Sequence, residues 1–456
     1  MKKNVLLVMA FFLIGSLAFA GGGQSGKSSS PQTRIVMASW YGGGSGRTLN
    51  GTLVEEFEKS HPNVKIVEDY TTYNEYHSKI NSMIAAGNAP DIMYLEEFRV
   101  NEWGERGVVA DLNPYYKDAG IDPKTFYVDG ALFTTGGKLW GVSNQFGTVI
   151  LYYNKKLFKE AGITPPPESA ANPWTWEQFV TAAKKLTKDS RGRTPNDSDF
   201  NYNNVVQYGT TNAGAYGGSW VYILPFIYTA GSSVANADGT EIEITKPAGV
   251  RALQNIANLA LVDRVAPTVA LSTTAVFSSL SSMLMNDQVA MYIANNGEYV
   301  NFANENYDVG IAQIPSMSGR GNNMFWGNGI TLKPGASKEA FEFMTDLLDF
   351  NKRVNAAKTY GLNLADIPQT RSVFDDPARN RAWLEVFSPV MARVTADILQ
   401  NGSRLGEQHT LKNFAEIMDR TLVPSWDKIW LGTESAQQVL GSLRQSLQGM
   451  LQGVWR

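Results

Sequence analysis

Apolar side chains recur at two different spacings along the chain, and the spacing changes from one segment to the next. Alternation, or a short continuous apolar run, predicts strands at residues 34–40, 64–67 and 91–95. Apolar positions three and four residues apart predict helices between them, at 49–57 and 73–84. Strands and helices in strict alternation indicate a parallel sheet whose faces are covered by helices.

The same alternation continues through the middle of the chain. It predicts strands at 149–153, 289–294 and 308–314, and helices at 176–186, 250–261, 277–285 and 338–350. From residue 379 onward the pattern is mostly helical, and the polar or proline-rich runs at 196–204 and 165–167 predict surface loops. The chain as a whole is therefore expected to be α/β.

The first twenty residues follow a different pattern, with Lys2 and Lys3 before a short apolar stretch that closes in Ala18-Phe19-Ala20. This arrangement is typical of a cleaved secretory signal peptide, so we assign residues 1–20 to it and 21–33 to a flexible leader. The chain contains no cysteine, which excludes both disulfides and a lipid-modified cysteine anchor. The mature protein is expected to be a periplasmic monomer, free in solution, of about 425 residues in two or three domains.

Composition narrows the function further. The formal net charge is −3, and removing Lys2 and Lys3 makes it −5, so no basic surplus exists to bind nucleic acid. The chain holds 11 Trp and 19 Tyr, side chains that stack on sugar rings while keeping a polar group in water. The three histidines, His61, His77 and His409, stand at no metal-ligand spacing from one another, so no metal or cofactor is expected.

The chain contains no complete nucleotide-binding or hydrolase motif. The glycine-rich run at 42–46 lacks the last glycine of a dinucleotide fingerprint, where Arg47 stands, and no phosphate-loop lysine follows. A turn that lets a ligand approach the backbone is the favoured interpretation. No Gly-x-Ser-x-Gly elbow supports a serine hydrolase, and sequence spacing cannot reveal the two carboxylates of a glycosidase.

Aromatic, acidic and amide side chains follow the predicted strands directly, at the edge where open α/β sheets bind ligands. Trp40 and Tyr41 end the first strand, and Glu96 and Glu97 follow the strand at 91–95. The remaining residues of this kind are Asn295, Asn296 and Glu298 after a later strand, and Trp326 and Asn328 in a glycine-rich turn. Aromatic faces combined with acids and amides are what sugar hydroxyls require.

Several segments in order resemble the family 1 extracellular solute-binding proteins, the sugar receptors of ABC importers. The most specific block begins at Gly137-Lys138-Leu139-Trp140-Gly141 and continues through Leu151-Tyr152-Tyr153-Asn154-Lys155 to Trp174-Thr175-Trp176-Glu177. Weaker matches are Gly87-Asn88-Ala89-Pro90-Asp91, Val289-Ala290-Met291-Tyr292-Ile293 and Tyr307-Asp308-Val309.

The resemblance implies two α/β lobes joined by hinge strands, with a ligand cleft between them. The implied first lobe comprises residues 34–146 and 315–367, and the second 147–314 and 368–456, with crossings at 145–148 and 308–315. Carried over by position, the ligand contacts of the first lobe are Trp40, Tyr41, Glu97, Gln145, Trp326 and Asn328. Those of the second lobe are Tyr216, Trp220, Asn296 and Glu298. Many relatives carry a tryptophan where this chain reads Asn295-Asn296-Gly297-Glu298-Tyr299, and Tyr299 could substitute for it.

We therefore expect a receptor, not an enzyme, that binds a mono- or oligosaccharide and delivers it to the membrane permease of an ABC importer. Two alternatives remain open on the sequence. One is a receptor for a phosphorylated polyol such as a glycerol phosphate, held by Arg47 or Arg99, and the other is a secreted glycoside hydrolase.

Overall fold

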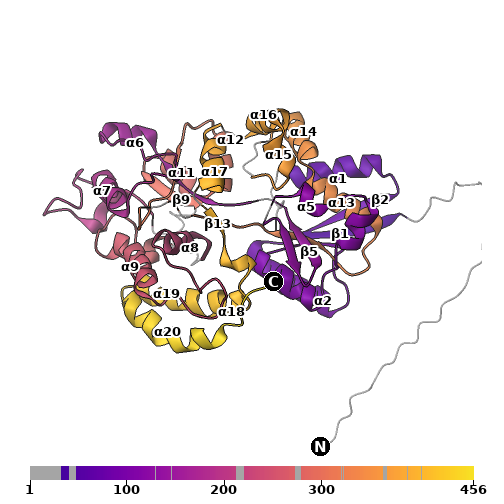
Figure 1. The fold of residues 1–456 in the computed structure, drawn as a ribbon. Helices are drawn as coiled ribbons and strands as arrows, with labels where there is room; N and C mark the ends of the chain where they lie inside the picture. The colour runs from indigo at the N-terminus through magenta and orange to yellow at the C-terminus, as the bar shows by residue number, and fades with distance from the viewer. Residues whose placement is uncertain are drawn as a thin grey trace, which may run out of the picture.

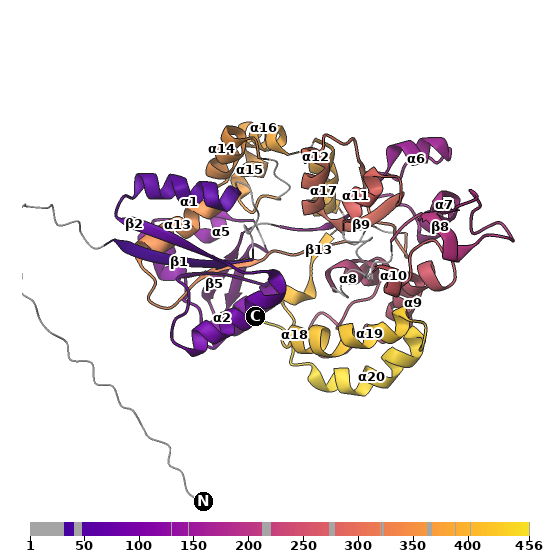
Figure 2. The same ribbon diagram turned by 180° about the vertical axis from the view of Figure 1, so that it is seen from behind.

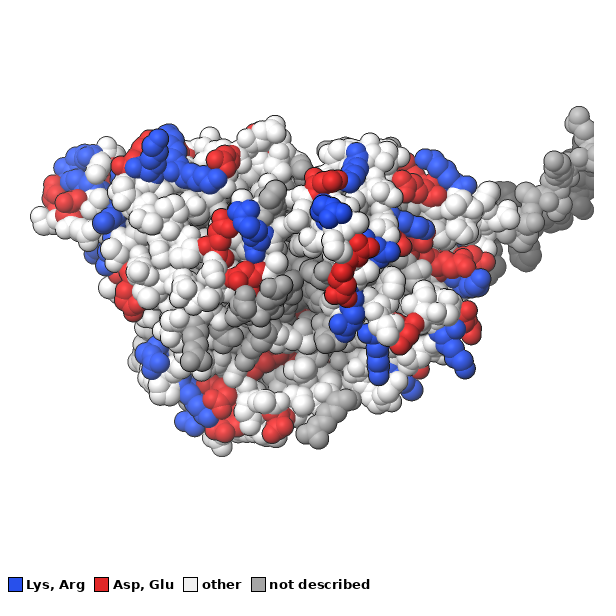
Figure 3. Space-filling model, turned by 45° about the horizontal axis from the view of Figure 1, so that its top comes forward, with Lys and Arg blue, Asp and Glu red and all other residues white. Residues whose placement is uncertain are grey.

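The computed structural model describes residues 32–40, 48–128, 130–144, 146–211, 220–272, 279–319, 321, 323–362, 367–387, 389–401 and 403–455. Two bodies of mixed sheet and helix lie side by side and are called here the first half and the second half (Figure 1; Figure 2). Figure 3 shows a hollow between them and acidic and basic side chains interspersed over both. No helix among the described residues is both long and apolar enough to cross a membrane.

The first half is built on a six-stranded sheet with the order β2-β1-β3-β12-β5-β4. Its strands are β1 (Thr33–Ser39), β2 (Val64–Tyr70), β3 (Ile92–Leu95), β4 (Leu132–Thr135), β5 (Lys138–Ser143) and β12 (Gly329–Leu332). Its helices are α1 (Leu49–Ser60), α2 (Tyr73–Ala85), α3 (Glu97–Glu105), α4 (Asn113–Asp118), α5 (Pro123–Phe126), α13 (Lys338–Leu348) and α14 (Phe350–Tyr360). β1 pairs in parallel with β2 and β3, as predicted, whereas β12 is antiparallel to β3 and β5.

Strand β3 shows why this sheet is stable. Its four residues are all buried, because helices cover both faces of the sheet. Ile92 and Tyr94 point into the core formed with α1 and α13, while Met93 and Leu95 point into a separate core with α2 and α3. Successive side chains of a strand alternate between faces, so a continuous apolar run is what a sheet covered on both sides requires.

The second half has a smaller, three-stranded sheet with the order β10-β6-β9. Its strands are β6 (Val149–Tyr153), β9 (Met291–Asn295) and β10 (Gly310–Ala312), and both pairings are antiparallel. Its helices are α6 (Lys155–Glu160), α7 (Trp176–Leu186), α8 (Trp220–Thr229), α9 (Pro247–Leu261), α10 (Val269–Ser272), α11 (Leu280–Met285), α12 (Tyr299–Asn304), α17 (Pro389–Asn401), α18 (Phe414–Ile417), α19 (Val423–Trp430) and α20 (Ala436–Met450). Short pairs are β7 (Lys188–Asp189) with β8 (Val205–Gln207), and β11 (Asn323–Phe325) with β13 (Ser403–Leu405).

Local capping explains where one predicted helix breaks. The pattern predicted a single helix over 338–350, but α13 ends at Leu348 and α14 begins at Phe350. The side chain of Asp349 accepts a hydrogen bond from the backbone N–H of Lys352 at 3.0 Å, which makes Asp349 the N-cap of a new helix. The predicted helix at 277–285 is α11, which begins at Leu280.

Short backbone bridges mark where the chain crosses between the halves, and two of them involve residues of the predicted crossing at 145–148. The backbone of Gly147 pairs with Trp326, and that of Phe146 pairs with Ile367. Part of the predicted crossing at 308–315 does not cross, because Gly310–Ala312 form β10 inside the sheet of the second half. The passage to the first half therefore falls between Ala312, the end of β10, and Gly329, the start of β12.

The predicted lobe ranges stay a prediction, but helix packing favours moving the boundary at residue 367 to a later position. Helices α15 (Arg371–Asp375) and α16 (Pro377–Val386) follow the predicted boundary at residue 367. Nevertheless, α15 contacts α5 and α16 contacts α14, both helices of the first half. α17 is the first later helix to contact the sheet of the second half, through β10.

Candidate functional site

The two halves meet along helix α3. This helix is separated from β3 by a single residue, Glu96, at the carboxyl edge of the larger sheet. Phe98 lies on this helix and is only 6% exposed, because it inserts between two aromatic rings of the second half. Its ring centroid is 6.3 Å from that of Trp220 and 5.8 Å from that of Phe414, which are 5.0 Å from each other. The start of α3 is thereby held against the second half.

A cluster of charged side chains surrounds this contact and includes members from both halves. Glu96, the N-cap residue of α3, forms an ion pair with His77 and accepts a hydrogen bond from Nε of Arg99 at 3.1 Å. Burial on its own would raise the pKa of Glu96, but the hydrogen bond and charge of His77, with the charge of Arg99, hold it below its ordinary value. Glu96 is therefore a carboxylate at neutral pH.

The second half contributes Asp419 to the same cluster. Burial raises the pKa of Asp419, while the positive charge of Arg99 and a hydrogen bond from Trp220 oppose the shift. Asp419 lies on a π-helical turn, Met418–Leu422, between α18 and α19. Single π-helical turns are rare and concentrate at functional sites. Trp220 thus joins Phe98 by ring contact and Asp419 by hydrogen bond.

Trp40 approaches this cluster from the first half. It is half-buried directly after β1, with its ring centroid 4.9 Å from Tyr76, 6.1 Å from His77 and 6.2 Å from Tyr94. Since His77 pairs with Glu96, the indole of Trp40 adjoins the cluster to which Asp419 and Trp220 belong. Two of the predicted contact residues, one from each half, therefore converge on one group of charged side chains.

Glu97 is the first residue of α3 and lies where the two halves meet. It is 2% exposed, and burial raises its pKa to about 8, against a hydrogen bond from the side chain of Gln408. Its Oε1 atom has no hydrogen-bond partner among the described residues. Glu97 is therefore largely a neutral carboxylic acid near pH 7, unlike its neighbour Glu96.

The side chains of Asn296 and Glu298 form hydrogen bonds with residues of the second half. Oδ1 of Asn296 accepts a hydrogen bond from the backbone N–H of Thr148 at 2.9 Å, so its amide holds the end of β9 to the start of β6. Oε2 of Glu298 accepts hydrogen bonds from Asn301 at 3.2 Å and from the hydroxyl of Tyr292 at 3.4 Å. Burial raises the pKa of Glu298.

Trp326 and Asn328 lie where the chain crosses between the halves. The backbones of Trp326 and Gly147 exchange hydrogen bonds of 2.8 and 3.0 Å, and the carbonyl of Asn328 accepts one from Asn144 at 3.0 Å. Both side chains are half-buried. Tyr41, Gln145 and Tyr216, with Arg47 of the alternative ligand, lie outside the described residues.

Sequence reasoning noted Glu96 and His77 but missed their partner Asp419. No local signal marks Asp419, because its role depends on a contact with residues far away in the chain. In the part of the chain that the structure describes, no three His, Asp or Glu side chains are placed to hold a metal ion.

Comparison with known proteins identifies similar chains. The family model described as "Bacterial extracellular solute-binding protein" matches residues 43–348. The sn-glycerol-3-phosphate-binding periplasmic protein UgpB of Escherichia coli (strain K12) is 25% identical over 413 residues, which are 85% of this chain and 86% of UgpB.

Solved structures share the fold. The ABC substrate-binding protein Lmo0181 from Listeria monocytogenes, in complex with cycloalternan, aligns with a TM-score of 0.74 at 24% identity over 92% of this chain and 98% of its own. Maltose-bound MalE3 of T. maritima aligns with a TM-score of 0.71 at 19% identity, and the alignment covers 92% of this chain and 100% of MalE3. The predicted two-lobed α/β fold is confirmed, and the two halves are its lobes.

Proposed function

Because this chain belongs to the family of bacterial extracellular solute-binding proteins, as the resemblance predicted, we propose that it binds a mono- or oligosaccharide between its halves and delivers it to an ABC importer. The protein is then a receptor without catalytic activity. Residues 1–20 act as its signal peptide, and the mature protein works as a periplasmic monomer. The importer permease recognises the state in which ligand holds the halves together.

The observation that supports a saccharide is the convergence of Trp40 and Trp220 on one cluster from opposite halves. Indole faces stack on sugar rings, and the carboxylates of Glu96 and Asp419 accept hydrogen bonds from sugar hydroxyls. A ligand that touches both Trp40 and Trp220 binds the closed arrangement more tightly than the open one, and this difference drives closure. Tyr41, Gln145, Tyr216, Trp326 and Asn328 remain proposed contacts around it.

The balance of charge favours a neutral ligand over a phosphate. Among the described residues of the cluster, Glu96 and Asp419 are acidic, and Arg99 donates a hydrogen bond to Glu96. A phosphate ester prefers several cationic donors free to bind it in a bidentate manner. The name of the UgpB relative keeps a glycerol phosphate as the second candidate.

Isothermal titration of the purified protein with a panel of mono- to tetrasaccharides, and separately with sn-glycerol 3-phosphate, tests the proposal. We expect at least one saccharide to bind with a dissociation constant well below millimolar. Trp220→Ala is expected to weaken that binding by about tenfold or more, since it removes the buried ring that packs on Phe98 across the two halves and the hydrogen bond to Asp419.

Trp174→Ala is the matched control, because Trp174 is a half-buried indole stacked on Phe158 in the second half, at 6.1 Å between centroids. It should leave saccharide affinity unchanged. Binding of glycerol phosphate without any saccharide would replace this proposal by the second candidate. Recovery of the bound oligosaccharide intact after long incubation is expected of a receptor, whereas its hydrolysis would indicate a glycosidase.

A further inference from the structure

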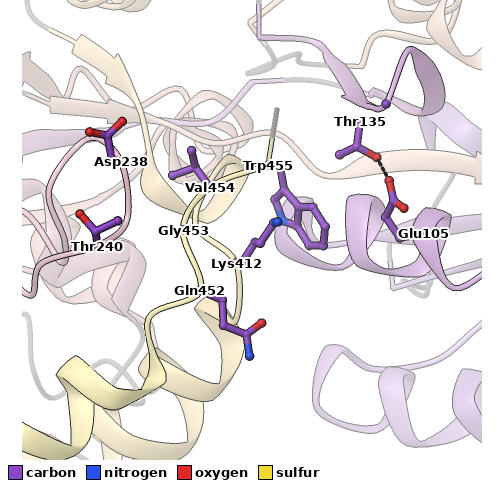
Figure 4. Close-up of a pocket in the computed structure, with 10 residues that line it drawn as sticks. Glu105, Thr135, Asp238, Thr240, Lys412, Gln452, Gly453, Val454 and Trp455 are labelled. Carbon is purple, nitrogen blue, oxygen red and sulfur yellow. Dashed lines mark hydrogen bonds between the residues drawn. The ribbon is translucent and has the colours of Figure 1, made fainter.

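A cavity of about 680 Å³ lies beyond the far end of helix α3. The first half lines it with Glu105, Thr135 and Gly136, and the second half lines it with Asp238, Thr240 and Lys412. The remaining wall is the tail segment, residues 451–455, of which Gln452 to Trp455 face the cavity (Figure 4). Its volume lies within the range of about 300–1,000 Å³ that is typical of small-molecule sites.

Backbone contacts fix the tail segment in place. The N–H of Trp455 donates to the carbonyl of Thr410 at 2.8 Å, and the N–H of Lys412 donates to the carbonyl of Gly453 at 3.0 Å. The N–H of Gly453 donates to the carbonyl of Gly239 at 3.1 Å. A Cβ on Gly239 would lie 2.7 Å from the backbone of Gly453, so this close approach requires glycine there. The wall that carries Trp455 is therefore built into the fold.

The lining chemistry selects a class of ligand. Trp455 is a half-buried aromatic side chain whose ring points from the tail segment toward Glu105 and Thr135, whereas Asp238 and Thr240 lie on the other side of that segment (Figure 4). Nζ of Lys412 lies 5.1 Å from the centroid of the Trp455 ring and occupies one face of the indole, so a ligand would have to stack on the opposite face, and a cationic ligand would meet the charge of the lysine. Among the described residues that line the cavity, Glu105 and Asp238 set two acidic groups against Lys412, which disfavours an anion. A neutral molecule rich in hydroxyl groups fits best.

We propose that this cavity is a second saccharide-binding site, with Trp455 as its stacking platform and with walls from both halves. The proposal rests on the proposed function, because it extends saccharide recognition to a place separate from the Trp40 and Trp220 cluster. Glu97 and Glu105 are eight positions apart on α3, about 12 Å along the helix axis, so the two sites lie at opposite ends of one helix. A sugar in this cavity contacts both halves and adds to the stability of the closed state.

The experiment measures binding of maltotriose to the full chain by ligand-observed saturation-transfer NMR and by titration. In the Trp220→Ala variant, which weakens the first site, we expect residual maltotriose binding from the second site. Adding Trp455→Ala to that variant should weaken the residual binding by about tenfold, whereas Trp455→Phe, which keeps an aromatic face, should retain most of it. Gln452→Ala is a second, milder variant that should weaken it by a smaller factor.

Each outcome decides the matter. Residual binding that is unaffected by Trp455→Ala and Gln452→Ala, or that is absent in Trp220→Ala, overturns the second site while the proposed function stands. Absence of binding to the unaltered protein by maltotriose and by the whole saccharide panel overturns both. Trp174→Ala in the same background is the control for loss of an indole, and thermal melting of each variant shows whether it is folded.

Discussion

The imidazole of His409 stacks on the phenyl ring of Phe133, with 5.2 Å between ring centroids and 3° between ring planes. Phe133 belongs to β4 of the first half, whereas His409 precedes α18 of the second. This stacked pair and the insertion of Phe98 both join the two halves, and Gln408, the residue before His409, hydrogen-bonds Glu97. The joint is therefore aromatic at its centre, with titratable groups buried inside it.

Burial lowers the pKa of His409 to about 3, compared with about 6.5 in an unfolded chain. The unfolded state therefore binds more protons between these values, so stability is complete above about pH 6.5 and declines as the pH falls toward 3. His409→Phe keeps a ring on Phe133 but cannot be protonated. We expect urea unfolding at pH 5 to show a loss of about 2 kcal/mol relative to pH 7.5 from this group, absent in the variant. Equal pH slopes in both proteins would contradict the assignment.

Glu97 has the opposite pH dependence. Its pKa rises from the ordinary 4.5 to about 8 on folding, so the folded state binds more protons between these values. Stability from the neutral acid is complete below about pH 4.5 and is lost as the pH rises through 8. Glu97→Gln cannot ionise, and we expect it to be about 2–4 kcal/mol more stable than the unaltered protein at pH 8.5, with little difference at pH 4.5. Chemical unfolding at the two pH values measures this; a variant less stable at both would exclude it.

Phe98 is expected to control how tightly the halves close. Phe98→Ala removes the ring between Trp220 and Phe414 and should cost about 3 kcal/mol of the contact energy. Small-angle X-ray scattering of the variant should show a larger radius of gyration, because the arrangement seen here loses a contact that holds its two halves together. Phe126→Ala, at a ring 37% exposed on α5, is the control and should leave the scattering unchanged.

Gly147 is required for close approach at the crossing between the halves. A Cβ there would lie 2.5 Å from the ring of Trp326, so Gly147→Ala must displace either the ring or the paired backbone. We expect a loss of about 1–3 kcal/mol. Gly441→Ala is the matched comparison, because Gly441 is exposed within α20 with only Gln437 near the added methyl, at 3.9 Å. It should stabilise the protein by about 0.5–1 kcal/mol in thermal unfolding.

The periodicity of apolar residues was sufficient to predict most of the elements in the described chain. The strand predicted at 91–95 is β3, and the helix predicted at 176–186 is α7, with the same bounds. Both follow from the local sequence: a short continuous apolar run in one, and an apolar stripe with the capping box of Thr175 and Gln178 in the other. The order of motifs also sufficed to predict the family and the two-lobed fold.

Only the tertiary structure decided which side chains face one another across the halves. Trp40 was predicted from its place at the end of a strand and Trp220 from the family resemblance, but Asp419 had no local signal and enters the cluster through long-range packing. Asn296 was predicted as a ligand contact and stays a prediction; the fold adds a hydrogen bond from the backbone N–H of Thr148 to its Oδ1, which the local pattern did not indicate. A periodic pattern records whether a residue is buried, because burial repeats with the geometry of its own helix or strand. It does not record the partner, because that depends on how distant segments pack together.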